Sequence, residues 1–167
     1  MALETVIENT RKATAADSAK AKVVFAVTGD LVGVTEVDLQ ARGHKVKVDE
    51  PPTLGGQDLG ANPVEHALIA LASCQAISYR FKAAQLGIAL DGLEVTAEGD
   101  LDVRGFLGFS DDVRPGFTAV RIQVTPRGPE PAERYEQLAD AVDAHCPVLD
   151  LFANATPVER TLAVPAA

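Results

Sequence analysis

The residues best suited to chemistry in this sequence are its two cysteines, Cys74 and Cys146. A cysteine thiolate acts as a nucleophile or a metal ligand, and two thiols can form a reversible disulfide. Cys74 lies within the apolar run ALIALASCQAI, where a lone cysteine is most often a small buried hydrophobe. Cys146 precedes Pro147 and follows His145, so it is expected at the N-terminus of a short helix. A helix N-terminus lowers thiol pKa values, and local sequence therefore indicates Cys146 as the more reactive thiol, with an inert N-cap cysteine as the alternative.

One carboxylate and three histidines are the other candidates. Glu65 lies nine residues before Cys74, which on a straight helix is about 13 Å of rise and half a turn. Glu65 therefore either stabilises the helix N-terminus or serves a thiol from another element or another chain. The histidines and cysteines lack the spacing of a zinc site, so no metal is expected; the histidines are His44, His66 and His145. Nucleotide-binding loops and the G-x-S-x-G motif are also lacking, so no cofactor is expected.

The elements that must position these residues begin with a polar lead-in, residues 1–20, in which Thr5–Ile7 is a candidate first strand. Alternating apolar residues then predict a hairpin or meander of three strands, at residues 23–27, 37–41 and 44–48. Arg42 and Gly43 form the turn between the last two strands. The segment DEPPTLGGQDLGAN (49–62) is rich in proline and glycine, which predicts a long loop of a kind that is often functional.

A long helix is predicted to begin after Asn62 and to end at about Leu86. Asn62 is a good N-cap, Pro63 suits the first helical position, and Gly87 is a typical C-terminal stop. The middle of this helix is apolar on nearly every side, so it must be covered all round. A helix about 36 Å long is difficult for one small domain to surround, which favours a partner subunit as part of the cover.

The sequence of the second half of the chain predicts further strands and helices. These are a strand or hairpin over 93–103, a strand over 120–124, helices over 131–144 and 147–153, and a last strand over 158–164. The loop from Arg104 to Phe117 carries three phenylalanines that either wall an apolar channel or belong to ordinary core, namely Phe106, Phe109 and Phe117. The order of elements indicates an α+β fold with antiparallel sheet packed on helices.

Composition excludes several classes of protein. The 167 residues are enough for one domain, and the formal net charge of −9 argues against binding to nucleic acid or to an anionic membrane surface. No run of about 18 apolar residues could span a bilayer, and the polar N-terminus lacks the apolar core of a signal peptide. We therefore expect a cytoplasmic protein, in which a structural disulfide would be unusual.

Three segments resemble the OsmC/Ohr family of osmotically inducible and organic hydroperoxide resistance proteins. The segment ANPVEHALIALASC (61–74) is similar to the first cysteine block of that family, HCPV (145–148) to the second, and DEPPTLGGQDLG (49–60) to the loop before the first block. The resemblance extends from about Val23 to the C-terminus. It implies an OsmC-like domain over 21–167 and an intertwined homodimer with central cysteine-bearing helices.

The resemblance also implies an activity, that of a thiol peroxidase that reduces organic hydroperoxides without metal or cofactor. Cys74 would attack the peroxide and become a sulfenic acid, Cys146 would form a disulfide with it, and a dithiol would restore both thiols. This reverses the ranking given by local sequence. The family activates its thiol with an arginine held by a glutamate, for which Arg42 and Glu65 are the nearest matches.

The match to the peroxidase subgroup departs at two positions. That subgroup has glutamate directly after the proline, where this chain has Val64, and its arginine position falls near Val32. Other arginines therefore stay open as activators, namely Arg104 and Arg114 beside the phenylalanine-rich loop. The alternative functions are a stress or small-ligand-binding protein on the same fold, or a redox sensor, each with little peroxidase activity.

Overall fold

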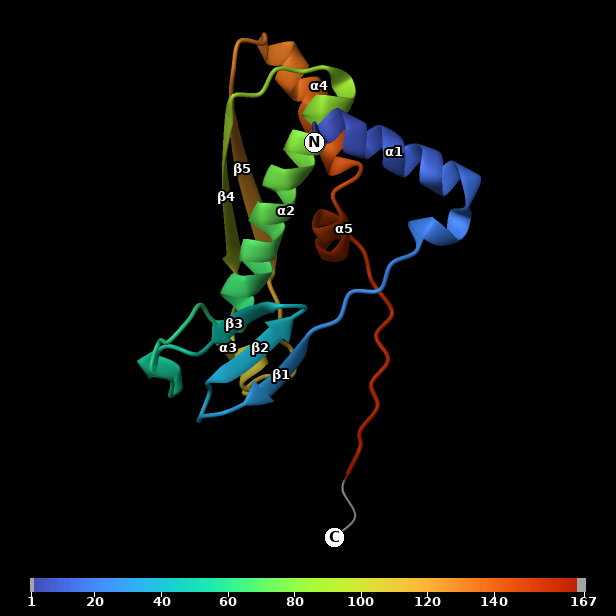
Figure 1. Cartoon of the computed structure of the whole chain (residues 1–167). Coiled ribbons are helices and arrows are strands. Elements are labelled where there is room, and N and C mark those ends of the chain that lie inside the picture. Colours follow the sequence, from blue (N-terminus) through green and yellow to red (C-terminus); the bar gives the residue numbers. More distant parts are fainter. Residues whose placement is uncertain (1, 165–167) are drawn as a thin grey trace.

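The computed structural model describes residues 2–164 and has two antiparallel sheets packed with helices, which confirms the predicted α+β class (Figure 1). One sheet contains β1 (Thr28–Leu31), β2 (Val37–Ala41) and β3 (His44–Val48) in sequential order. The other sheet pairs β4 (Gly92–Asp100) with β5 (Ala119–Arg127). Helix α2 (Pro63–Leu86) packs against β4 and against two later helices, α4 (Ala132–Asp143) and α5 (Pro147–Ala153). The short helical turns are η1 (Ser18–Ala21), η2 (Pro52–Leu54) and α3 (Val103–Phe106).

Helix α2 begins and ends where the sequence predicts, because both ends are capped. The Asn62 side chain accepts a hydrogen bond from the Glu65 backbone N–H, and the Glu65 carboxylate accepts one from the Asn62 N–H, each at 2.8 Å. This reciprocal pair satisfies two backbone donors that a helix N-terminus leaves free. At the other end Gly87 has the left-handed conformation, with φ of 61°, which glycine adopts without steric cost.

The hydrophobic core joins α2 to α4. Leu138 and Val142 of α4, which are four residues apart and so share one face of the helix, are fully buried. They pack in one cluster with residues of α2, of the segment before β4 and of the α4–α5 junction, namely Tyr79, Ala83, Ile88, Leu90 and Cys146. One of the two cysteines is therefore a core residue, and Cys74 packs against the same cluster.

The N-terminal segment differs from the prediction. The strand expected at Thr5–Ile7 is wrong, since helix α1 covers Leu3–Ala16. The carboxylate of Glu8 pairs with Arg11 at 2.8 Å and with Lys12 at 3.4 Å, and pairs three and four residues apart stabilise a helix. Helix α1 has no buried residue, so it lies on the outside of the packed structure.

Two other predicted strands also differ. Residues 23–27 and 158–164 are extended but pair with no strand among residues 2–164, and their apolar side chains are largely exposed (Figure 1). Strand formation needs a neighbouring edge as well as an alternating sequence, and these two segments lack one within the described chain. Of the strand or hairpin predicted over 93–103, the single strand is confirmed as β4, after which Val103–Phe106 forms the helical turn α3.

A buried carboxylate organises the glycine-rich loop before α2. The Asp49 side chain is only 1% exposed and accepts hydrogen bonds from the Thr35 hydroxyl and from the backbone N–H groups of Glu50, Gln57 and Leu59, at 2.5 to 3.3 Å. These bonds, that from Thr35 above all, favour the ionised form and lower the pKa of Asp49 to about 2. The hydrogen bonds to this one carboxylate, at the start of the loop, therefore hold the loop in place.

We expect Asp49→Asn to lower the melting temperature at neutral pH, because the amide replaces an acceptor oxygen by a donor facing backbone N–H groups. The pKa of Asp49 is lower in the folded state than the ordinary value of 3.8. The stabilisation by the carboxylate is therefore complete above that value and is lost as the pH falls toward 2. Thermal unfolding of both proteins from pH 7 to pH 2 should show the difference shrinking below pH 4; a constant difference would contradict this role.

Candidate active site

The two cysteines, 72 residues apart in the sequence, meet in the structure. Their Sγ atoms are 3.5 Å apart, and both are free thiols. Cys74 comes from the middle of α2, and Cys146 is the N-cap residue of α5, which packs beside α2 (Figure 1). A disulfide needs about 2.05 Å between the sulfurs, so a small local shift would join them.

The environments of the two thiols differ. Cys146 is only 2% exposed, whereas Cys74 is partly exposed. Burial raises the pKa of the Cys146 thiol, the neighbouring Cys74 acts in the same direction, and the opposing hydrogen bonds from the Leu149 N–H and the Ser78 hydroxyl are outweighed. The lowering of the Cys146 pKa that local sequence predicts at a helix N-terminus is therefore outweighed by burial. His145 does not reverse this, because its Nδ1 is bonded at 2.9 Å to a backbone carbonyl of α4.

The other two predicted site residues, Glu65 and Arg42, lie away from the cysteine pair. Glu65 forms the capping pair described above, two and a half turns before Cys74. Arg42 is exposed at the β2–β3 turn, where it has a positive φ of 55° and its carbonyl oxygen accepts a hydrogen bond from Gln40. In Figure 1 this three-stranded sheet lies beside the start of α2, away from α5. The described chain thus brings the two cysteines together without bringing Glu65 or Arg42 to them.

A cavity of about 390 Å³ lies one helical turn from the cysteine pair. Its apolar walls come from α2, β5 and α5, namely Leu71, Val120, Ile122, Leu149 and Phe152. Leu71 is three residues before Cys74, and the Leu149 N–H bonds to Cys146. The cavity therefore adjoins the elements that hold both thiols.

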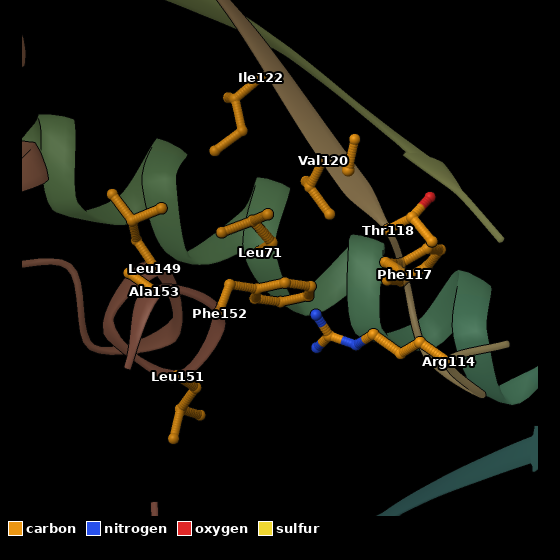
Figure 2. A pocket seen from close by; sticks show the side chains of 11 residues that line it. Leu71, Arg114, Phe117, Thr118, Val120, Ile122, Leu149, Leu151, Phe152 and Ala153 are labelled. Atoms are coloured by element: carbon orange, nitrogen blue, oxygen red, sulfur yellow. The ribbon is translucent and has the colours of Figure 1, made fainter. Parts of the chain in front are cut away.

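One arginine enters this cavity. Figure 2 shows the guanidinium of Arg114 directed toward the ring of Phe152, with Phe117 on the same side. The rings of Phe117 and Phe152 are stacked, with centroids 6.3 Å apart. We call this space the Arg114 cavity. It combines an apolar lining with one cation.

The other residues of the phenylalanine-rich loop lie outside the cavity. Phe106 and Phe109 are exposed, so of the three phenylalanines considered for a channel only Phe117 lines the Arg114 cavity. Arg104 forms an ion pair with Asp102 on the same turn. Of the two further arginines considered from the sequence, Arg114 is the one that reaches the cavity beside the thiols.

Sequence reasoning missed a buried amide beside the first cysteine. Gln75 is 1% exposed, and its Nε2 donates to the Asp143 carboxylate at 3.5 Å. Its Oε1 has no hydrogen-bond partner within residues 2–164. One turn later on α2, burial raises the pKa of Tyr79 to about 12, and the negative charges of Asp143 and Asp140 add to this shift. The available signal was that Gln75 is the one amide in the apolar run from residue 67 to residue 77.

Metal sites and membrane-spanning helices are both absent from the part of the chain that the structure describes. Residues 2–164 contain no group of three or more histidine, cysteine or acidic side chains placed to hold a metal ion. Over the same residues, no helix has both the length and the apolar character needed to cross a membrane. The thiol pair with its neighbouring cavity is therefore the candidate active site.

Comparisons with known proteins assign the chain to a family. The family model for OsmC-like proteins matches residues 55–161. The OsmC-like protein of Mycoplasma pneumoniae is similar in structure, with 16% identity over 79% of this chain and 89% of that one and a TM-score of 0.69. The organic hydroperoxide resistance protein OsmC of Legionella pneumophila (19% identity, 78% and 89% coverage, TM-score 0.60) shares this fold. So does an organic hydroperoxide resistance protein of Elizabethkingia anophelis (18% identity, 78% and 88% coverage, TM-score 0.60). None of the curated proteins matches the sequence. The chain belongs to the OsmC-like protein family.

Proposed function

We propose that this protein is a thiol peroxidase that reduces organic hydroperoxides through Cys74 and Cys146. The observation that carries the proposal is the 3.5 Å separation of two free thiols from different helices. Family membership supports it, since structural relatives from Legionella pneumophila and Elizabethkingia anophelis are described as organic hydroperoxide resistance proteins. The apolar Arg114 cavity beside the thiols suits an organic substrate.

The proposed cycle balances with a hydroperoxide and a dithiol as the only co-reactants. The Cys74 thiolate attacks the terminal oxygen of ROOH, the O–O bond breaks, and RO⁻ takes a proton to leave as the alcohol. Cys146 then attacks the sulfur of the Cys74 sulfenic acid, which forms the disulfide and releases water. A dithiol is oxidised to its own disulfide as it returns both cysteines to thiols.

The asymmetry of the two thiols supports this division of roles. The attacking thiol must ionise and must be reached by substrate, and Cys74 is the more exposed of the two. Burial raises the pKa of the Cys146 thiol, so it ionises less readily than an exposed thiol and is less suited to the first attack. Its position 3.5 Å from Cys74 suits it to attack a sulfenic acid formed on that residue.

A cation near Cys74 would stabilise its thiolate and polarise the O–O bond. Arg114 is the candidate within the same chain, because its guanidinium enters the cavity one turn from the thiols. Arg42, with Glu65, is the candidate that would have to act across a dimer, since both lie away from the cysteines of their own chain. We assign the role to Arg114 and keep Arg42 as the competing assignment.

A homodimer is part of the proposal. Two apolar residues eight positions apart on α2 are exposed, Ile69 at 51% and Ile77 at 60%, although the helix lies between the other elements. A second copy packed along this face would cover it and could bring its own Arg42 turn toward Cys74. Gel filtration at micromolar concentration should give the mass of two chains, and a monomer would contradict this part of the proposal.

The function is tested by intact mass and free-thiol counting before and after one equivalent of cumene hydroperoxide. We expect the loss of both thiols and of two hydrogens, with one equivalent of cumyl alcohol formed, faster than a free cysteine reacts. Dithiothreitol should restore both thiols. Two thiols still free beside unconsumed peroxide would contradict the proposal and favour a binding role.

The two arginine assignments predict different effects of substitution on the rate of peroxide consumption. Arg114→Gln should lower the rate of peroxide consumption by about tenfold or more, because one charge that stabilises the transition state is lost. Arg42→Gln should change the rate by less than about twofold, a change that corresponds to only a few tenths of a kcal/mol. Stopped-flow measurement of Cys74 oxidation checks both variants, with Arg104→Gln as the control because that arginine is paired with Asp102. A large loss in Arg42→Gln alone would assign the activating charge to Arg42.

A further inference from the structure

Gln75 is an unusual residue for the centre of a packed helix. Its side chain is 1% exposed, yet its Oε1 has no hydrogen-bond partner within residues 2–164. A buried polar atom without a partner lowers the stability of the fold, and an apolar side chain of similar volume would avoid that loss. The amide at this position therefore calls for a role other than packing.

The side-chain hydrogen bond of Gln75 joins the helix that carries Cys74 to the helix that precedes Cys146. Gln75 follows Cys74 directly on α2, and its Nε2 donates to the Oδ1 of Asp143, 3.5 Å away on α4. Asp143 is the last residue of α4 and lies three residues before Cys146. Burial is the main cause of the raised Tyr79 pKa, and the charges of Asp143 and Asp140 add to it, which agrees with an arrangement in which the C-terminal turn of α4 faces α2.

We propose that Gln75 is a positioning residue that holds the junction between α4 and α5 so that Cys146 faces the oxidised Cys74. This inference rests on the proposed peroxidase function. The step it controls is attack of the Cys146 sulfur on the Cys74 sulfenic acid, which forms the S–S bond and releases water. The competing step is attack of the same sulfenic acid on a second hydroperoxide, which gives a sulfinic acid and an alcohol. A displaced Cys146 therefore shifts the partition toward sulfinic acid.

Gln75→Leu and Asp143→Ala are the variants that test this role. Each removes the hydrogen bond between Gln75 on α2 and Asp143 on α4. Misplacement of the Cys146 sulfur by a fraction of an ångström should then slow disulfide formation by about tenfold. Under excess cumene hydroperoxide, mass spectrometry should show a correspondingly larger ratio of sulfinic acid to disulfide at Cys74. Asp143→Asn keeps an acceptor oxygen for the Gln75 amide and should retain the partition of the unmodified protein. The double variant should be no worse than either single variant, because both remove the same bond.

Asp140→Ala is the matched control, since Asp140 is an exposed carboxylate on the same helix that also acts on Tyr79 but does not bond to Gln75. In Asp140→Ala, the ratio of sulfinic acid to disulfide at Cys74 should not change. If Gln75 had a purely structural role, the rate of disulfide formation and the melting temperature would fall together. We expect instead that Gln75→Leu melts at the same or a higher temperature and forms the disulfide more slowly. If Gln75→Leu fails to fold, the exposed Asp143→Ala decides. An unchanged partition in Asp143→Ala, or an equal shift in Asp140→Ala, would overturn the inference.

A peroxide-independent measurement separates this inference from the proposed function. Diamide oxidises two neighbouring thiols to a disulfide without a sulfenic acid, and its closing step also depends on how Cys146 faces Cys74. Slower closure in Gln75→Leu and Asp143→Ala than in Asp140→Ala would support the positioning role even if no variant consumed hydroperoxide. Equal closure rates in all of these proteins would overturn it, whatever the peroxidase activity.

Discussion

Cys74→Ser should abolish catalytic hydroperoxide reduction, lowering the rate by about a thousandfold or more, because a serine hydroxyl cannot replace the thiolate as nucleophile. Cys146→Ser should behave differently. It should consume about one equivalent of peroxide per chain, since the first step needs only Cys74, and should then stop for lack of a resolving thiol. These outcomes would show that the two thiols, 3.5 Å apart, have separable roles.

The measurement is peroxide consumption with dithiothreitol as reductant, combined with trapping of the sulfenic acid by dimedone. In Cys146→Ser, dimedone should label Cys74, and excess peroxide should convert it to sulfinic acid. The unmodified protein should show little of either product because the disulfide forms first. Multiple turnovers by Cys74→Ser would contradict the assignment of Cys74, and full activity in Cys146→Ser would contradict the resolving role.

Leu138→Ala should lower the free energy of unfolding by about 3 kcal/mol, which is typical of a fully buried leucine cut back to alanine. Leu138 lies in the core cluster that joins α2 to α4 and also contains Cys146. Urea unfolding of the reduced protein checks this expectation, with the exposed Glu136→Ala on the same helix as control. A loss below about 1 kcal/mol would show that the α2–α4 contact is not the main core.

Helix α2 was predictable from the sequence because each of its ends carries a local signal. The Asn62–Glu65 pair and Gly87 act within one turn of the chain, so no distant contact is needed to fix these boundaries. Helix α1 was missed because Thr5, Val6 and Ile7 are β-branched and suggested a strand. The pairing of Glu8 with residues three and four positions later was the signal that indicates a helix there.

The site was predictable to a smaller extent. The resemblance implied that the two cysteines act together, and the structure brings them to 3.5 Å. Local sequence could not give the burial of Cys146, because burial depends on how α4 and α5 pack against α2. The same holds for Arg114, which reaches the cavity from a loop whose path no periodicity describes. Tertiary packing, which a single sequence does not display, determined each of these features.

The long sequence separation of the two cysteines has a consequence for the energetics of the unfolded chain. A bond between residues 72 positions apart would close a loop that contains the second half of α2, both strands of the second sheet and all of α4. In the chain-entropy description, a crosslink around a loop of this size favours the folded state by about 4 kcal/mol. The oxidised protein would then unfold at a higher temperature than the reduced one. Oxidant exposure would thereby make the molecule harder to unfold and to digest, so its lifetime in a proteolytic environment would itself report the redox state.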